Sequence, residues 1–365
     1  MNRYTKRIIS FLLITVLFIS GCTKVEDKKI NIQGDNIVVD NLDREIEIPK
    51  KIDRIAGLDS LAGELIVMLG GGNRMVATVG GVKSDKLLQK LSPNLEDLAM
   101  PVAGGAMNYE SMMTLNIDFA FIKKDLYNVD KIKEQLKEMN IPFYVMSYDS
   151  IDEQKKCISD IGVILGGESK ERAEEFIKYY DKSLEFAERK KKLLDKNNYK
   201  KVYHSINQVA RTDRANTLSA EWIDKVGIKN VSLGENLRDD GKGVYANLEQ
   251  IHMWNPEYII CNSPEAVKYI KENEQWRGID AVDNGKVYQM PVGATRWGHP
   301  GSAETPLAIY WLGKVVYPEL YSDIDLYEEV KYFYKNVLNL DIDEQTYNMI
   351  IEGEEMRKTG GKNPQ

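Results

Sequence analysis

The sequence predicts an α/β protein of two Rossmann-like lobes, each built on a parallel-type sheet, joined by one long rigid α-helix. Short apolar runs alternate with helix-like stretches over residues 37–150, a long amphipathic stretch without Gly or Pro follows, and the alternation resumes after residue 199. Strands separated by helical segments indicate parallel sheets with helices on their faces. Roughly 340 residues beyond the N-terminal leader also exceed one ordinary core, which favours two domains.

Residues 1–22 have the pattern of a secretory signal peptide. Three basic residues precede the apolar run IISFLLITVLFIS, which is too short for a comfortable membrane span. The junction FISGC resembles the lipobox of bacterial lipoproteins, which implies cleavage before Cys22 and acylation of that cysteine. Several acyl chains on one residue give stable anchoring. We therefore expect an extracytoplasmic protein, lipid-anchored to the bacterial cell membrane; an ordinary signal peptide with a chance cysteine is the alternative.

Residues 23–36 are polar and charged and are expected to form a tether, followed by an N-terminal lobe over residues 37–150. The lobe opens with two alternating runs around Asn41-Leu42-Asp43, a hairpin signal. Its further apolar runs predict strands, and the stretches between them predict helices. The strand runs are RIAGL, MVATV, FAFI and FYVMS, and the helical stretches include AGELIVMLG and VDKIKEQLKEMN.

A connecting segment, residues 151–198, contains the long helix. From Glu168 to Lys196, apolar residues recur mostly at intervals of three, four or seven among Lys, Glu and Asp. We expect one helix of about 29 residues, near 43 Å long at about 1.5 Å per residue. A coiled-coil partner helix is the alternative, but the apolar seam is short for one.

The C-terminal lobe is expected over residues 199–350, with a polar tail at residues 351–365. We see no sequence repeat between the two lobes beyond their shared rhythm. The expected strands are KVYHSI, EYIICN and KVYQMP, and the expected helices are SAEWIDKVG, LEQIHMW, AVKYIKEN and PLAIYWLGKVVYP.

Composition excludes several classes of function. The formal net charge is −7 and no basic stripe with interleaved aromatics occurs, which argues against nucleic-acid binding. Beyond Cys22 only Cys157 and Cys261 remain, too few for a disulfide framework, and we expect both to be free. No G-x-S-x-G, H-E-x-x-H or phosphate-loop motif occurs, so we do not expect an enzyme.

The loop "VGATRWGHPGSAETP" is the strongest candidate for a binding site. In parallel α/β sheets ligands collect at the carboxyl ends of the strands, and the loops there can face a cleft between two lobes. This loop follows the last apolar strand and carries Arg296, Trp297 and His299 between glycines and prolines. An adhesin without a small ligand would not explain this crowding.

Five segments resemble, in order and spacing, the class III substrate-binding proteins of ABC importers, which deliver siderophores, haem, cobalamin, and some nickel or molybdate species. The resemblance covers about residues 37–350 and implies a receptor that passes an Fe³⁺-siderophore-type chelate to a permease with its ATPase. We expect the chain to be a monomer. It implies no intrinsic cofactor. Corrinoid is the first alternative ligand, then a nickel chelate, molybdate or haem. The segments are DNLDREIEIPKKIDRIAGL, NYESMMTLNIDFAFI, NLEQIHMWNPEYII, WRGIDAVDNGKVYQMP and LAIYWLGKVVYPELY.

Arginine and aromatic side chains are the expected ligand contacts, because guanidinium groups bind carboxylate or catecholate oxygens in pairs. Arg296 and Trp297 supply both chemistries side by side. The same rim of the second lobe is expected to carry Arg211, Arg214 and Arg238. The alternative for these three is pairing with the nearby Asp213, Asp239 and Asp240.

Two histidines are candidate metal ligands, His299 and His204, each at or just after a second-lobe strand. A hydrogen-bonding role is the alternative for both. Some members of the family coordinate iron with His and Tyr, which makes Tyr109, Tyr148 and Tyr245 candidates. Met107 stands where certain haem-binding members carry an axial methionine, but their histidine position is Cys261 here, which argues against haem. Filling of the core is the alternative for Met107, and we favour it.

The resemblance also implies that each lobe offers a surface carboxylate to arginines of the permease, since paired charges set docking register. We assign Glu64 to the first lobe and Asp224 to the second, with Glu221 as a fallback. Acidic residues are also favoured in early helical turns by the macrodipole, which is the alternative explanation.

Overall fold

The computed structural model describes residues 36–353 of the chain. The expected signal peptide with Cys22 lies outside the described residues, as do the tether apart from Asn36 and the tail beyond Gly353. Within residues 36–353 no helix is long and apolar enough to cross a membrane. The two free cysteines, Cys157 and Cys261, are both buried.

The first lobe is built on a four-stranded parallel sheet in the order β4-β3-β7-β8. Its strands are almost continuously buried, as expected for a parallel sheet covered on both faces. A hairpin of β1 (Ile37–Val39) and β2 (Glu45–Glu47) precedes the sheet. The sheet strands are β3 (Ile55–Leu58), β4 (Met75–Thr78), β7 (Phe119–Lys123) and β8 (Phe143–Met146).

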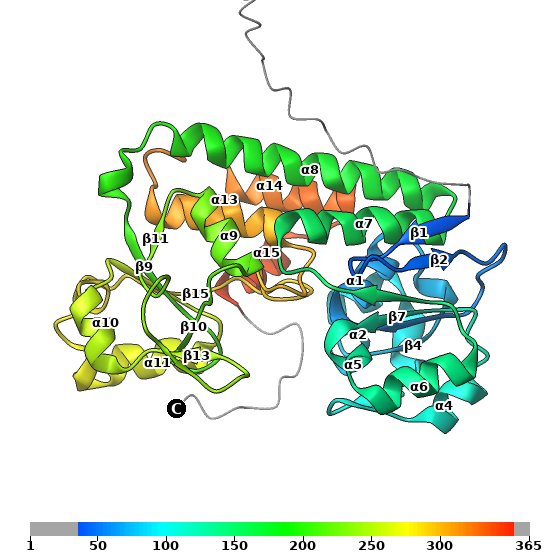
Figure 1. The fold of residues 1–365 in the computed structure, drawn as a ribbon. Coiled ribbons are helices and arrows are strands. Elements are labelled where there is room, and N and C mark those ends of the chain that lie inside the picture. The colour runs from blue at the N-terminus through cyan, green and yellow to red at the C-terminus, as the bar shows by residue number, and fades with distance from the viewer. Residues whose placement is uncertain (1–35, 354–365) are drawn as a thin grey trace, which may run out of the picture. The chain divides into compact units, whose positions relative to one another are not determined.

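Short helices and one small hairpin surround this sheet (Figure 1). The hairpin pairs β5 (Val102–Ala103) with β6 (Ala106–Met107). The helices are α1 (Ser60–Met68), α2 (Gly80–Lys83), α3 (Lys86–Leu91), α4 (Tyr109–Thr114), α5 (Lys124–Tyr127) and α6 (Asp130–Met139).

The second lobe repeats this plan with a parallel sheet in the order β11-β9-β14-β15 and adds a small antiparallel sheet, β10-β13-β12. The predicted α/β class with parallel sheets is thereby confirmed. The main strands are β9 (Lys201–Ser205), β11 (Lys229–Asn230), β14 (Tyr258–Cys261) and β15 (Val287–Gln289). The others are β10 (Arg211–Thr212), β12 (Arg238–Asp239) and β13 (Val244–Tyr245). The helices are α9 (Leu218–Lys225), α10 (Leu248–Trp254), α11 (Pro264–Glu272) and α12 (Asp280–Asp283).

Two helices connect the lobes, α7 (Ile151–Leu165) and the longer α8 (Glu168–Lys191), and they run side by side (Figure 1). The α8 helix has 24 residues, shorter than the expected span to Lys196, because the chain turns after Lys192 into a 3-10 turn capped by Asp195. Near its start, Ser169 donates to the Leu69 carbonyl at 2.8 Å. At its end, the Lys191 Nζ lies 2.8 Å from the Asp224 carboxylate. The helix is therefore tied to both lobes.

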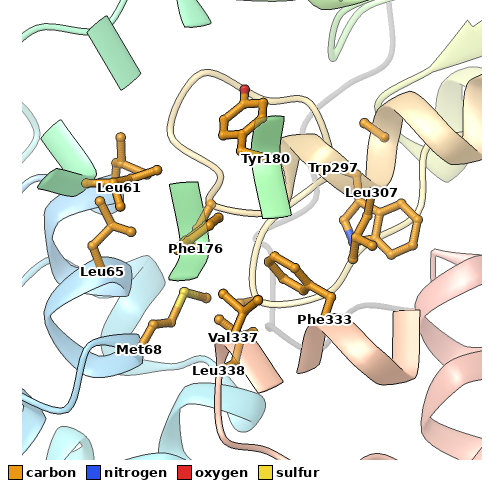
Figure 2. Packing of buried hydrophobic residues seen from close by; sticks show 14 of the residues in the cluster. Leu61, Leu65, Met68, Phe176, Tyr180, Trp297, Leu307, Phe333, Val337 and Leu338 are labelled. Atoms are coloured by element: carbon orange, nitrogen blue, oxygen red, sulfur yellow. The ribbon is translucent and has the colours of Figure 1, made fainter. Parts of the chain in front are cut away.

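One hydrophobic cluster continues from the first lobe through α8 to the C-terminal helices (Figure 2). It joins Leu61 of α1 to Phe176 of α8, and Phe176 meets Phe333 edge-on with ring centroids 5.6 Å apart. The C-terminal elements are α13 (Thr305–Val316), α14 (Leu326–Tyr332), a π-helical turn (Phe333–Val337) and α15 (Glu344–Glu352). Because close-packed cores transmit strain rather than absorb it, a shared core favours small lobe motions.

The structure reveals an internal repeat that the sequence rhythm did not disclose. Asn108 and Asn247 cap α4 and α10, and each is followed two residues later by a glutamate. Eight residues after each cap stands an asparagine with positive φ, 47° at Asn116 and 43° at Asn255. Two residues further on, Asp118 and Glu257 accept backbone N–H groups at the starts of β3 and β9. The shared pattern is N-x-E-x₅-N-x-[DE].

Candidate functional site

The loop of residues 292–304, called here the interlobe loop, lies where the two lobes meet. Glu64 of α1 accepts the Ala303 N–H at 3.3 Å and the hydroxyl of Thr295. Gln154 of α7 donates to the carbonyls of Pro300 and Ser302 at 3.2 and 2.9 Å. The loop that the sequence singled out therefore touches the first lobe and the connecting helix.

Trp297 does not face the gap between the lobes. Its side chain is 1% exposed and belongs to the continuous core, where it is labelled together with Leu307 and Phe333 (Figure 2). The adjoining Gly298 has φ 70°, and its carbonyl accepts the Trp222 indole N–H at 2.9 Å. The prediction of Trp297 as an aromatic ligand contact is therefore wrong, because packing turns this ring inward.

Arg296 is half-buried at the carboxyl end of the second-lobe sheet. An antiparallel bridge joins it to Val292 just after β15. Its charge lowers the pKa of His204, which places the guanidinium close to the end of β9. Arg296 thus combines partial exposure with a position at the strand ends of the second lobe, next to the junction with the first lobe.

His204 is not placed to bind a metal. Its Nδ1 lies 2.9 Å from the Asp213 carboxylate, and its Nε2 lies 2.9 Å from the Asn262 side-chain oxygen. Asn230 also donates to Asp213 at 2.7 Å. Burial by itself lowers the pKa of His204, but the Asp213 carboxylate and the two hydrogen bonds outweigh it and raise the pKa. Both ring nitrogens are engaged, so the metal-ligand prediction for His204 is wrong.

His299 lies near the start of the first-lobe helix α1, and its role as a metal ligand stays a prediction. Its Nδ1 accepts the Gly301 N–H at 3.0 Å. A Cβ placed on Gly301 would lie 3.5 Å from Ser60, so this turn approaches the first lobe closely. Within residues 36–353, no three His, Cys, Asp or Glu side chains gather closely enough to hold a metal ion.

Three of the predicted rim residues form one row on the small antiparallel sheet. Arg211 and Arg238 are both paired in register with Tyr245, and residues directly opposite in a sheet share one face. The Arg238 guanidinium lies 4.4 Å from the centre of the Tyr245 ring. Arg211 donates to the Lys242 carbonyl at 2.9 Å. Arg214, in contrast, forms an ion pair with Asp239 at 2.6 Å, the alternative that the sequence allowed.

The first-lobe candidates are less accessible. Met107 of β6 and Tyr109 of α4 are partly buried and pack against the core of the first sheet. Their ligand roles stay predictions. Tyr148 donates to the carboxylate of Asp59 at 2.8 Å, and burial with this neighbouring carboxylate raises the pKa of Tyr148 far above its ordinary range.

A cavity of about 580 Å³ lies between the segment that follows β8 and the start of α9. The Ile151 N–H donates to Glu221 at 2.8 Å across this boundary, so the cavity spans both lobes. Three carboxylates line it, which sequence reasoning had not placed together. The lining residues are Asp149, Ser150, Glu153, Ala215, Asn216, Thr217, Ala220, Glu221 and Leu233.

The predicted docking carboxylates do not form a surface pair. Glu64 is fully buried, so it cannot meet a partner protein, and the prediction is wrong. The helix α1 is buried along most of its length because both the sheet and the interlobe loop cover it. Asp224 is 64% exposed but is already paired with Lys191.

Comparison with known proteins agrees with this architecture. The profile of the periplasmic binding protein family matches residues 55–292. The chain is 27% identical over 330 residues to the molybdate-binding protein MolA of Haemophilus influenzae, which covers 83% of this chain and 90% of that protein. It is 24% identical over 324 residues to YvrC of Bacillus subtilis, an uncharacterized ABC transporter substrate-binding lipoprotein, covering 86% of this chain and 97% of that protein.

Solved structures show the same fold. MolA bound to molybdate superposes with a TM-score of 0.72 at 23% identity, covering 84% of this chain and 99% of that one. CeuE of Helicobacter pylori with Ni(II) bound superposes with a TM-score of 0.67 at 20% identity, covering 86% of this chain and 99% of that one. In both, the metal species is a bound ligand.

Proposed function

Because this chain belongs to the periplasmic binding protein family, we propose that it is the solute-binding component of an ABC importer and that its solute is an anionic metal complex of the ferric-siderophore type. The solute would lie between the lobes at Arg296, which is not one of the residues lining the cavity with three carboxylates, and pass from there to the permease. The chain would act without chemical catalysis, because its role is to bind and release.

The position of Arg296 carries this proposal. Arg296 is a partly buried residue at the carboxyl ends of the second-lobe strands, next to the junction with the first lobe. Arg211 and Arg238, held in one row with Tyr245, add a second cationic surface with an aromatic face. Guanidinium groups pair with catecholate or carboxylate oxygens, and aromatic rings stack on planar chelate arms. An anionic chelate matches this chemistry.

The connection between the lobes supports a largely preformed site. The α8 helix is tied to both lobes, and one core runs through all three parts. Large hinge closures need segments that absorb backbone rotation, whereas here the joint is packed. A preformed gap favours a bulky solute over one that must be wrapped by closing lobes.

Molybdate is the second candidate solute. The MolA relative, named for molybdate binding, is matched over 90% of its length. A tetrahedral oxyanion needs several N–H donors within one small space, and Arg296 with neighbouring backbone N–H groups could supply them. Molybdate would not need the row of Arg211, Tyr245 and Arg238. Substitutions in this row should therefore weaken binding of a ferric chelate but leave binding of molybdate unchanged.

One binding panel tests the proposal. Tryptophan fluorescence would be titrated with a ferric tris-catecholate, sodium molybdate and nickel–histidine, each against the purified chain. We expect micromolar or tighter binding of the ferric chelate. Molybdate binding alone would replace the first candidate by the second. Metal analysis of protein purified from its own host provides an independent check, because a co-purified metal identifies the solute class.

The internal repeat supplies a better docking pair than the one predicted. Glu110 and Glu249 occupy the same position, two residues after a capping asparagine, and both are exposed. Equivalent carboxylates on two similar lobes match a permease that presents two equivalent cationic sites, because paired charges set docking register. We assign the docking role to this pair.

Membrane attachment through an acylated Cys22 remains part of the proposal, supported by the lipobox-like junction and by the lipoprotein relative YvrC. A Cys22→Ala variant should no longer be labelled by radioactive palmitate and should leave the membrane fraction. Labelling that survives this substitution would contradict the anchor.

A further inference from the structure

Two buried carboxylates hold the residue next to Arg296. Thr295 donates its hydroxyl to Glu64, which comes from α1 of the first lobe. It also donates its backbone N–H at 2.9 Å to Glu304, which caps α13 on the other side of the loop. Glu64 and Glu304 are both fully buried. Thr295 is therefore held from both sides of the interlobe junction.

Glu304 is itself fixed by three donors. It receives the N–H groups of Ala294 at 3.2 Å and Thr295 at 2.9 Å, and the hydroxyl of Tyr334. Tyr334 lies in the π-helical turn, a rare element that recurs at functional sites. A Cβ on Gly293 would overlap both the Glu304 carboxylate and the Tyr334 hydroxyl, so only glycine fits beside them.

This arrangement suits an ionised carboxylate. An ionised carboxylate only accepts hydrogen bonds, whereas a protonated one carries an O–H that must donate. A protonated Glu304 can donate to the Tyr334 hydroxyl, because a phenol accepts as well as donates. The two backbone N–H groups of the interlobe loop then bond to a neutral carboxyl, and hydrogen bonds to an ionised carboxylate are roughly twice as strong as those to a neutral group. The loop is held most firmly when Glu304 is charged.

We propose that Thr295 is a positioning residue that ties Arg296 to both lobes, and that ionisation of Glu304 decides how firmly Arg296 is held. The inference rests on the proposed function, since Arg296 matters only if the site takes an anionic solute. Under it, solute binding strengthens as Glu304 ionises. Because Thr295 is bound to Glu64 of α1 and to Glu304 before α13, a shift of α1 relative to α13 should also change the position of Arg296.

The ionisation falls in an accessible pH range. Burial raises the pKa of Glu304 to about 7, against the lowering effect of Tyr334 and the two backbone N–H groups. Within the described residues, the titratable groups that act on it are Tyr334 from the π-helical turn and Asp85 before α3. Glu64 from α1 is linked to it through Thr295, which donates to both carboxylates. The Asp85 carboxylate adds to the raised pKa of Glu304.

Hydrogen exchange of the solute-free chain tests the device. We expect the protection factors of the Ala294 and Thr295 amides to rise about tenfold between pH 5.5 and pH 8.5, because these amides open locally when Glu304 is protonated. Glu304→Gln should keep protection low at both pH values, since a neutral amide oxygen is a weaker acceptor than an ionised carboxylate. Equal protection at both pH values in the unmodified chain would overturn the proposal.

Two further variants keep the test decisive if Glu304→Gln folds poorly. Tyr334→Phe removes one donor that lowers the pKa of Glu304, so the rise in protection should move to higher pH. Glu175→Gln is the matched control, because Glu175 is an exposed partner of Lys178 on α8, and it should behave as the unmodified chain. A Tyr334→Phe profile identical to the control would also overturn the proposal.

Measurements of solute affinity test the link to the proposed function separately from the hydrogen-exchange experiment. The affinity for ferric tris-catecholate or molybdate, whichever binds, should rise over the same pH range and lose this dependence in Glu304→Gln. If neither probe binds but exchange behaves as expected, the proposed solute fails while the positioning device stands. A bound probe whose affinity ignores Glu304 contradicts the link to Arg296.

Discussion

His204 and Asp213 form a buried hydrogen-bonded pair, with Nδ1 of the imidazole 2.9 Å from the carboxylate oxygen. Asn262 occupies the other ring nitrogen, and Asn230 donates to the same carboxylate oxygen. The pair joins the ends of β9 and β14 to the segment after β10. It therefore holds these strand ends together, and both nitrogens of the His204 ring are engaged.

Substituting His204 should cost stability in a pH-dependent way. His204→Gln leaves the buried Asp213 without its cation, a loss of about 3 kcal/mol of unfolding free energy. Because the folded pKa of His204 is raised above 6.5, its contribution is fully present below pH 6.5 and is lost as pH rises through the folded value. Urea unfolding at pH 5.5 and pH 9 should show the larger deficit at pH 5.5.

His252→Gln is the control for that measurement, because His252 makes a single ring contact, to the Gln275 carbonyl, on the outer helix α10. Its unfolding midpoint should stay near that of the unmodified chain at both pH values. A stability deficit in His204→Gln that grows as the pH rises would contradict the prediction and reject the charged form of His204.

Substituting Arg296 should weaken solute binding without unfolding the chain. Arg296→Ala is expected to reduce affinity for the ferric chelate at least about tenfold, or about 1.4 kcal/mol. Arg214→Ala is the matched control, because Arg214 is already paired with Asp239 and should cost little affinity. Fluorescence titration decides, and equal affinities of the two variants would remove Arg296 from the site.

Substituting Trp297 should, in contrast, lower the stability of the chain. Its buried ring fills the shared core, and Trp297→Ala should lower the unfolding free energy by about 3–5 kcal/mol. Chemical denaturation measures this directly. If the variant kept full stability and lost only affinity, the ring would face the solute after all.

Reversing charge on the docking pair should stop uptake and spare binding. Glu110→Arg with Glu249→Arg places like charges opposite the expected cationic sites of the permease. Both positions are exposed, so stability and solute affinity should be unchanged. Uptake of labelled solute in the native host is the readout, with Glu175→Arg as the exposed control. Normal uptake by the double variant would contradict the docking role of Glu110 and Glu249.

Much of the fold was predictable because it depends on local patterns. The runs RIAGL and EYIICN lie in β3 and β14, and alternation of strands with helices implied the parallel sheets. The length of α8 was overestimated because Leu194 continues the apolar rhythm after the helix has ended. The repeat that starts at Asn108 and Asn247 gives only a weak sequence signal, because its shared residues are few and serve backbone geometry.

The candidate site, like the fold, was predictable only where it depends on local sequence patterns. The amino-acid pattern alone established that Arg296 sits on a loop after the last strand of the second lobe, because strand order and loop position follow from hydrophobic periodicity. It took the folded chain to reveal that Trp297 faces the core, that His204 is engaged by Asp213, and that Glu64 reaches a partner 231 residues away. The direction and burial of a polar side chain depend on which distant segments pack around it, and such contacts leave no periodic trace in the chain.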